Sequence, residues 1–357
     1  MNILFMYTGM DIGGAQRVIV DLIKQLQSDS VNCVLVSCNG EMLNEIKEAG
    51  IKNYILPLKS KSPISLLKNI KAVVDICKKE NIDIIHSHHR LTTLIGLIIS
   101  KFCKVKLIHT EHNVFPDKNW INVRGKNIIA VSNMVRGNLL KHNVKEENIR
   151  VIYNGININK NPVEKTRSLL EEYNLKVSSV NIGVIARYSK QKAHLFLLAA
   201  IKELIEQEYD INLLLIGEGE ERGSIEEFIH EHGLSDRVKL TGNRTNVIDI
   251  INQLDFFVLP SIYEGLPISV LEIMSQGKVL IATNVGGNKE VINNGENGFL
   301  IESGDTKALL ETIKYVYNNL DNLSEIKEKA RKRIEDDFSL DNMVNKHKEY
   351  YKQLLEK

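Results

Sequence analysis

Two glutamates at a fixed spacing carry the plainest chemical pattern in the sequence. Glu264 opens a Glu-Gly-Leu-Pro turn after the apolar run 256–259, and Glu272 lies about two helical turns further on. Pro267 suits the first turn of a helix, whose unpaired N–H groups favour phosphate. Carboxylates beside that helix start can accept hydrogen bonds from sugar hydroxyls. The pattern fits a sugar nucleotide, and it also fits a capping glutamate followed by a solvated helical one.

Two cations follow a second apolar run. The run 180–185 is typical of a buried strand; Arg187 comes directly after it, and Lys192 follows five residues later. An arginine can hold phosphate oxygens with two N–H groups at once, and a lysine adds a point charge. This segment therefore predicts an anion site, with two exposed loop cations as the alternative.

A glycine-rich loop follows the first predicted strand, residues 2–8. Its spacing is G-x-x-x-G-G and ends at Gly13 and Gly14, before a helix with apolar residues at helical spacing. This is not the dinucleotide fingerprint, because the glycine spacing differs and no acidic residue ends the second strand. The loop predicts either a close backbone approach to a ligand or a tight turn.

Three histidines follow the predicted strand 82–85, at positions 86, 88 and 89. Their density invites a metal site, but no carboxylate or cysteine follows them at a ligand-like spacing. The four cysteines show no metal-like pairing either and are expected to be reduced thiols of a cytosolic protein. We expect no metal.

The composition predicts two globular domains. The chain has 357 residues, of which 43% are hydrophobic and 25% charged. The first residues do not resemble a signal peptide, and the apolar stretch 91–99 is too short to span a bilayer. We expect a cytoplasmic protein that is soluble or peripheral to the membrane.

Charge is unevenly distributed along the chain. Residues 1–170 hold 24 Lys and Arg against 14 Asp and Glu, although the whole chain has a net charge of only +1. Residues 60–80 predict an amphipathic helix with an apolar stripe surrounded by lysines, a pattern found in helices that lie on anionic membranes. The alternative is a helix that packs on its own domain.

The Glu264–Glu272 pattern resembles the Glu-x7-Glu motif of the retaining glycosyltransferases of family 4, also called glycosyltransferase group 1, of the bacterial polysaccharide-biosynthesis type. The segment from Arg187 to Lys192 is similar to the family's Gly-Arg-x4-Lys-Gly, with Ala186 and Ala193 in place of the glycines. Alanine at 193 is expected to preserve the backbone path but to limit a positive φ. Two further segments resemble family motifs, namely 153–157, with Tyr153 replacing the usual proline, and Gly286-Gly287 followed by Glu290.

The resemblance implies an α/β protein with the GT-B fold, in which two Rossmann-like, doubly wound domains face each other across a cleft. The alternation of strands and helices supports two such domains independently. The expected boundaries are an acceptor-binding domain at 1–157, a linker at 158–178 and a donor-nucleotide domain at 179–338. The last helix, within 339–357, is expected to cross back to the first domain.

The resemblance also implies residue roles. Arg187 and Lys192 would neutralise the leaving diphosphate, Glu264 would hold hydroxyls of the transferred sugar, and Glu272 would hold those of the ribose. A histidine near the transferred sugar is chosen as His112, with His109 as the second choice. These assignments give the catalytic set His112, Arg187, Lys192 and Glu264, and the donor-binding set Gly13, Gly14, Arg187, Lys192, Asn243, Glu264, Gly265, Leu266, Pro267 and Glu272.

The expected function is transfer of a sugar, with retention, from a UDP- or GDP-sugar to a glycan or lipid-linked glycan in cell-surface polysaccharide synthesis, such as lipopolysaccharide or capsule. No cofactor, metal or nucleic acid is expected, and the basic first domain predicts contact with the inner face of the plasma membrane. The alternatives are a sugar-nucleotide epimerase of the same fold, which the two glutamates fit poorly, and a non-catalytic sugar-nucleotide-binding protein.

Overall fold

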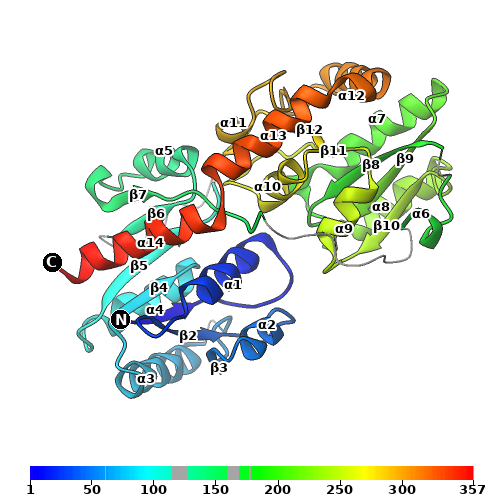
Figure 1. The fold of residues 1–357 in the computed structure, drawn as a ribbon. Coiled ribbons are helices and arrows are strands. Elements are labelled where there is room, and N and C mark those ends of the chain that lie inside the picture. Colours follow the sequence, from blue (N-terminus) through cyan, green and yellow to red (C-terminus); the bar gives the residue numbers. More distant parts are fainter. Residues whose placement is uncertain (61, 115–126, 159–168, 177, 357) are drawn as a thin grey trace. The chain divides into compact units, whose positions relative to one another are not determined.

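The computed structural model describes residues 1–60, 62–114, 127–158, 169–176 and 178–356. The chain forms two compact units, one of Met1–Ile156 with Leu340–Lys357 and the other of Asn157–Ser339 (Figure 1). Most of the linker expected at 158–178 lies outside the described residues, which resume there at a short helix, α6 (Leu169–Glu172).

The first unit is built on a seven-stranded parallel sheet in the order β3-β2-β1-β4-β5-β6-β7. The strands are β1 (Asn2–Met6), β2 (Asn32–Ser37), β3 (Lys52–Ile55), β4 (Ile84–Ser87), β5 (Lys106–Glu111), β6 (Ile128–Ala130) and β7 (Ile149–Val151). The helices are α1 (Gly14–Leu26), α2 (Leu43–Glu48), α3 (Pro63–Lys79), α4 (Arg90–Ile99), α5 (Asn133–Lys141) and α14 (Leu340–Leu355), with a 3₁₀ turn η1 (Glu146–Asn148).

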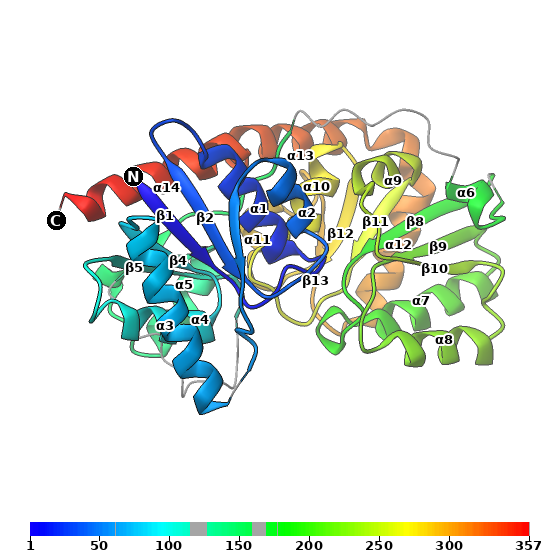
Figure 2. The same ribbon diagram turned by 90° about the horizontal axis from the view of Figure 1, so that it is seen from below.

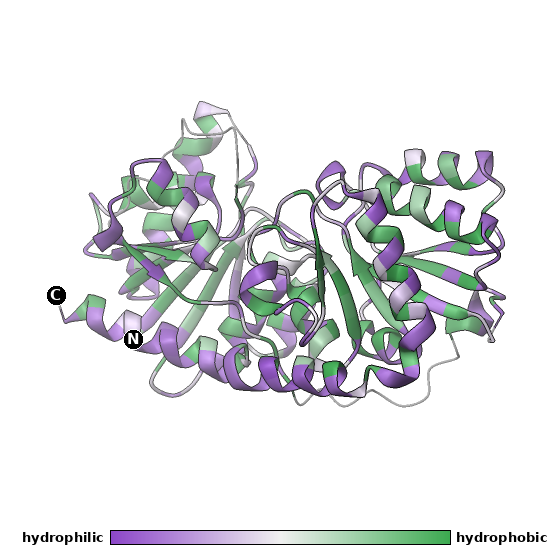
Figure 3. Ribbon diagram, turned by 90° about the horizontal axis from the view of Figure 1, so that it is seen from above, coloured by the Kyte–Doolittle hydropathy of each residue, from purple (hydrophilic) through white to green (hydrophobic). Residues whose placement is uncertain are grey.

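The central strands of this sheet have continuous apolar sequences because helices cover both faces of the sheet there. Figure 3 shows strands coloured hydrophobic next to helices of mixed colour. The C-terminal helix α14 packs against α1 and buries Tyr351 completely. Helix α14 therefore contributes side chains to the core of the first unit.

The second unit has a six-stranded parallel sheet in the order β10-β9-β8-β11-β12-β13. Its strands are β8 (Val180–Ile185), β9 (Ile211–Ile216), β10 (Val238–Gly242), β11 (Phe256–Leu259), β12 (Val279–Thr283) and β13 (Phe299–Ile301). Besides α6, its helices are α7 (His194–Glu206), α8 (Arg222–Glu231), α9 (Val247–Gln253), α10 (Ile268–Ser275), α11 (Asn288–Val291), α12 (Thr306–Asn319) and α13 (Ser324–Asp337), with 3₁₀ turns η2 (Lys190–Lys192) and η3 (Leu320–Asn322).

These two sheets confirm the prediction of two doubly wound α/β units. The helix after Glu264 differs by one residue from the sequence expectation, because Pro267 lies at the N-cap of α10 instead of in its first turn. The helix ends before Gly277, whose φ of +63° suits the left-handed residue that closes a helix. None of the helices in the described part of the chain combines the length and apolar character needed to cross a bilayer.

Candidate functional site

Most of the predicted site residues of the second unit lie on loops that follow strands at one edge of its sheet, and Glu272 lies inside α10. Arg187 follows β8 and Glu264 follows β11, and these two strands are neighbours. The strand order reverses between them, since β9 and β10 lie on one side and β12 and β13 on the other. In open parallel sheets, ligands bind outside the carboxyl ends of the strands at such a reversal.

The structure brings Lys192 and Glu264 together. The Lys192 Nζ atom lies 2.5 Å from Glu264 Oε1, although 72 residues separate them in the sequence. The lysine side chain is 16% exposed and the glutamate side chain 7%. Two charges removed from water in this way are held only if each keeps the other as a partner. The pair therefore forms a fixed charged centre at the ends of β8 and β11.

One side-chain and one backbone hydrogen bond join these two loops. Gln191 Nε2 donates to the carbonyl oxygen of Tyr263 at 2.7 Å, and the N–H of Ile262 donates to the carbonyl oxygen of Gln191 at 2.8 Å. Gln191 is not among the predicted site residues, and its only signal in the sequence is its place between the two predicted cations. Its contacts fix where Lys192 and Glu264 meet.

A glycine pair after β12, Gly286 and Gly287, packs against the backbone of the turn that contains Glu264. A Cβ atom on Gly286 would lie 1.9 Å from the carbonyl oxygen of Glu264, and Gly286 has a φ of +54°. The N–H of Gly287 donates to the carbonyl oxygen of Gly265 at 2.8 Å. In the sequence this pair resembles a family motif, but it is not among the predicted site residues. It packs directly on the backbone of Glu264 and Gly265.

Arg187 differs from Lys192 in its surroundings. Its side chain is exposed, and with the other described residues it forms neither a hydrogen bond nor an ion pair. A guanidinium at the end of a strand, with its donors open to solvent, is free to hold an anion bidentately. Asn243, which follows β10, is likewise exposed.

Helix α10 follows the glutamate turn and begins without a side-chain cap. Leu266 is buried before it, and Glu272 lies half-buried within it. An uncapped helix start keeps N–H groups available for an anion. The chain thus provides cations, carboxylates and helix N–H groups at one edge of the second sheet.

Ala193 corrects one expectation from the sequence. Alanine was expected to limit a positive φ here, but Ala193 adopts φ +51° and ψ +43° between η2 and α7. Left-handed backbone costs a residue with a Cβ atom about 1–2 kcal/mol. The path of the loop is kept, and the alanine carries strain that glycine would not.

Ala193→Gly is therefore expected to raise the free energy of unfolding by about 0.5–1 kcal/mol, because relief of strain exceeds the entropy that glycine adds to the unfolded chain. Urea denaturation measures this. Ala199→Gly, at an exposed position inside α7, is the matched control and should destabilise by about 1 kcal/mol. Equal destabilisation by both substitutions would contradict the strain argument.

The predicted site residues of the first unit lie at the ends of β1 and β5. Gly13, with an extended backbone, is the N-cap of α1, and Gly14 is the first helical residue; no side chain caps this helix. His112 directly follows β5 and is partly exposed. Burial lowers the pKa of His112 to about 4, so its imidazole is neutral at physiological pH.

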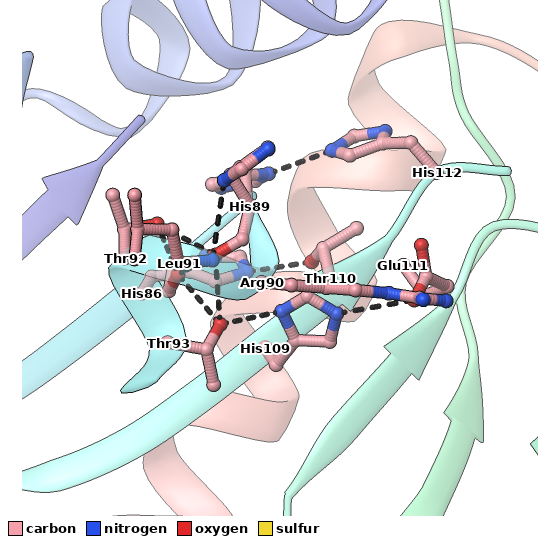
Figure 4. A network of polar contacts seen from close by, with 12 residues as sticks. His86, His89, Arg90, Leu91, Thr92, Thr93, His109, Thr110, Glu111 and His112 are labelled. Carbon is pink, nitrogen blue, oxygen red and sulfur yellow. Dashed lines mark hydrogen bonds and ion pairs between the residues drawn. The ribbon is translucent and has the colours of Figure 1, made fainter. Parts of the chain in front are cut away.

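The two histidines considered at the end of β5, His109 inside the strand and His112 directly after it, have different surroundings. His109 is 1% exposed, and its Nδ1 atom lies 2.7 Å from Thr93 Oγ1. Figure 4 shows its ring held between Thr93 and Glu111. His109 is thus a core residue, and of the two only His112 retains contact with solvent.

Two of the three histidines at or after the end of β4, His86 and His88, are also buried, whereas His89 is exposed. His86 is bonded through Nδ1 to the Tyr351 hydroxyl and through Nε2 to Thr110 Oγ1, both at 2.7 Å. His88 Nδ1 lies 2.9 Å from His112 Nε2. Within the described ranges, no group of three or more His, Cys, Asp or Glu side chains is arranged to hold a metal ion.

Comparison with known proteins decides the family. Two family profiles match in succession, Glycosyltransferase Family 4 over residues 12–160 and Glycosyl transferases group 1 over residues 166–333. An uncharacterized glycosyltransferase of Methanocaldococcus jannaschii is 31% identical over 324 residues, which cover 86% of each chain. The chain belongs to the group 1 glycosyltransferases of family 4. The sequence-based prediction of the family and of a glycosyltransferase activity is confirmed.

Two further proteins resemble this glycosyltransferase over nearly its whole length. An Escherichia coli protein named UDP-Gal:alpha-D-GlcNAc-diphosphoundecaprenol alpha-1,3-galactosyltransferase is 26% identical over 95% of this chain and 94% of its own. The crystal structure of Anabaena HepE in complex with UDP-glucose superimposes with a TM-score of 0.88 and 21% identity, over 99% of this chain and 100% of that chain. The structural likeness shows the GT-B fold of this glycosyltransferase.

Proposed function

We propose that this glycosyltransferase moves a sugar from a UDP-sugar to a lipid-linked glycan acceptor, with retention of the anomeric configuration, in cell-surface polysaccharide synthesis. The observation that carries the proposal is the buried Lys192–Glu264 pair at the strand-order reversal, with the exposed Arg187 on the loop before it. The UDP donor is supported by the UDP-galactose in the name of the E. coli relative and the UDP-glucose bound to HepE.

Each predicted site residue of the second unit has a chemical task in the proposed reaction. The bond from the anomeric carbon to the diphosphate oxygen breaks, and negative charge develops on the leaving diphosphate. Arg187 and Lys192 stabilise that charge in place, which is the kind of interaction that accelerates a reaction most. Glu264 accepts hydrogen bonds from the sugar, Glu272 from the ribose, and Asn243 borders the base. The N–H groups at the start of α10, after Gly265, Leu266 and Pro267, add donors to the phosphates.

The acceptor attacks the face of the sugar that the diphosphate leaves. Its hydroxyl oxygen forms the new bond to the anomeric carbon, and its proton passes to the departing phosphate, so no protein carboxylate is used as a nucleophile. His112 is proposed to hydrogen-bond a sugar hydroxyl as a neutral imidazole. Gly13 and Gly14 permit the close approach of the backbone to the donor phosphate and the acceptor.

A thermal-shift panel with UDP, GDP and ADP tests the donor. A ligand present at about 100 times its Kd stabilises the native state by about 2.7 kcal/mol. We expect UDP to raise the melting temperature more than GDP or ADP. A larger shift with GDP or ADP would overturn the UDP assignment, and no shift with any of the three would overturn the proposed donor site.

The lipid-linked acceptor is supported by the surface of α3. The predicted apolar stripe divides, because Val73 and Cys77 are buried in the core whereas Ile64 and Leu67 are 68% and 69% exposed. Figure 2 shows the N-terminal end of α3 projecting beyond the strands of its own unit. With the exposed lysines on the same helix, these side chains suit an anionic membrane surface, where long-chain acceptors reside.

The double substitution Ile64→Ser with Leu67→Ser is expected to weaken binding to phosphatidylglycerol-containing vesicles by about tenfold, because two apolar side chains no longer enter the lipid. Vesicle sedimentation measures it. Tyr315→Ser, at an exposed aromatic residue of α12 in the second unit, is the control and should leave binding unchanged. Equal binding by the parent and the double variant would contradict membrane contact through α3.

A further inference from the structure

His88 and His112 form a direct contact between two imidazole rings in the first unit. The Nδ1 atom of His88 lies 2.9 Å from the Nε2 atom of His112, and the rings stack at 5.2 Å with an interplanar angle of 26°. His88 is 4% exposed, whereas His112 is partly exposed. One ring of the pair is thus enclosed by protein and the other reaches solvent.

A hydrogen bond between two neutral imidazoles links their tautomers. Burial lowers the pKa of both rings, and each ring then carries one proton. If His88 donates from Nδ1, His112 accepts at Nε2 and keeps its proton on Nδ1. If His112 donates from Nε2, its Nδ1 is a bare acceptor. The tautomer of His88 therefore decides whether the Nδ1 atom of His112 is a donor or an acceptor.

The surroundings of His88 favour one of these arrangements. Its Nε2 atom is buried and has no hydrogen-bond partner within the described part of the chain. The ring packs against His86 at 4.1 Å and Phe5 at 5.9 Å between centroids. Unpaired buried N–H groups are rarer than under-used acceptors. The proton of His88 therefore belongs on Nδ1, where the His112 nitrogen accepts it.

We propose that His88 is a positioning residue that fixes the tautomer of His112, so that His112 presents Nδ1–H as a donor to a hydroxyl oxygen of the substrate. This inference rests on the proposed function of His112 in sugar transfer. It extends that function by assigning the direction of the hydrogen bond, with the substrate hydroxyl as acceptor. His88 itself does not touch the substrate and acts through His112.

Other titratable groups around the pair do not replace this contact. They are His86 from β4, His109 and Glu111 from β5, and His347 from α14. Glu111 is bonded to Arg90 at 3.0 Å, so its charge is already matched. The Nδ1 atom of His347 donates to the carbonyl oxygen of Met343 at 2.8 Å. The atom that meets His112 Nε2 is His88 Nδ1.

Two substitutions at His88 test whether His112 needs a hydrogen-bond donor or an acceptor at position 88. His88→Asn places an amide N–H where Nδ1–H was, and we expect kcat within about threefold of the parent at all pH values. His88→Asp places a carboxylate there instead, which raises the pKa of His112 and retains a proton on its Nε2. At low pH the His112 imidazolium still donates from Nδ1. As the pH rises through the raised pKa, that proton is lost.

For His88→Asp we therefore expect kcat to fall by about tenfold or more as the pH rises. The fall reflects the loss of one hydrogen bond from His112 to the substrate. The parent and His88→Asn should not show this fall. A rise of kcat with pH in His88→Asp would mean that His112 uses Nδ1 as an acceptor, and would overturn the proposal. Equal loss in both variants, without a change in pH profile, would show a structural role only.

A spectroscopic measurement separates this inference from the proposed function. In the parent without ligands, ¹⁵N NMR distinguishes protonated from bare imidazole nitrogens, and His112→Gln assigns the His112 signals by their disappearance. We expect a bare Nε2 and a protonated Nδ1 on His112, and the reverse pattern would overturn the inference even if sugar transfer is found. Absence of turnover by the parent with every UDP-sugar would overturn the proposed function and leave this tautomer result standing.

Discussion

Replacing Arg187 by alanine is expected to lower kcat by about 10²–10³-fold while the melting temperature changes by no more than about 1–2 °C. The activity loss follows from removing a preorganised cation from the leaving diphosphate. The stability should hardly change, because the exposed Arg187 side chain forms no hydrogen bond or ion pair with the other described residues. Steady-state assay of UDP release and a thermal melt measure the two quantities.

Lys190→Ala is the matched control for this experiment, since Lys190 is an exposed cation three residues further along the same loop. We expect its kcat to stay within about twofold of the parent, because screened surface charges contribute little. Similar losses in both variants would show that the loop acts through its total charge and that Arg187 has no specific place in the reaction.

In a double-mutant cycle at the Lys192–Glu264 pair, we expect the double variant to recover stability but not activity. Lys192→Met or Glu264→Gln leaves a charge with little solvent contact and no partner, and each should destabilise the fold by about 2 kcal/mol. The double variant removes both charges and should recover most of that loss. All three variants should lose about 10²-fold or more in kcat. Loss of Lys192 removes a charge that stabilises the leaving diphosphate, and loss of the Glu264 carboxylate weakens the hydrogen bonds to the sugar.

Urea denaturation gives the coupling free energy of the cycle, and turnover of the UDP-sugar gives the activity. Recovery of activity together with stability in the double variant would mean that the pair serves the fold alone. Destabilisation that simply adds in the double variant would mean that the two side chains do not interact as their 2.5 Å contact indicates.

Much of the fold could be predicted because local patterns and global structure agree in this chain. The apolar run before Arg187 is a fully parallel, covered strand, and such strands read as continuous apolar segments. Glu264 and Arg187 were recognisable because both follow such runs, and carboxyl ends of parallel strands gather at one edge. Their type and position in the sequence therefore sufficed to place each of them at the carboxyl end of a buried strand, whereas the pairing of β8 with β11 came from the structure.

The remaining features depend on contacts that no local pattern encodes. Gln191 meets Tyr263 across 72 residues, and His88 meets His112 across 24. Helical periodicity places Ile64 and Val73 on the same apolar stripe of α3. Ile64 is nevertheless exposed, because the N-terminal end of α3 extends beyond the core in which Val73 is buried. The positive φ of Ala193 is imposed by the loop between η2 and α7 against the preference of the residue.

The most direct test of the central claim is a transfer assay with labelled UDP-sugars and a polyprenyl-diphosphate-linked glycan in anionic vesicles. We expect label from one UDP-sugar to enter the lipid-extractable product. The new linkage should have the anomeric configuration of the donor by ¹H NMR, and Glu264→Gln should abolish the signal. A product of inverted configuration, or epimerised UDP-sugar without transfer, would contradict the account, as would an equally active Glu264→Gln variant.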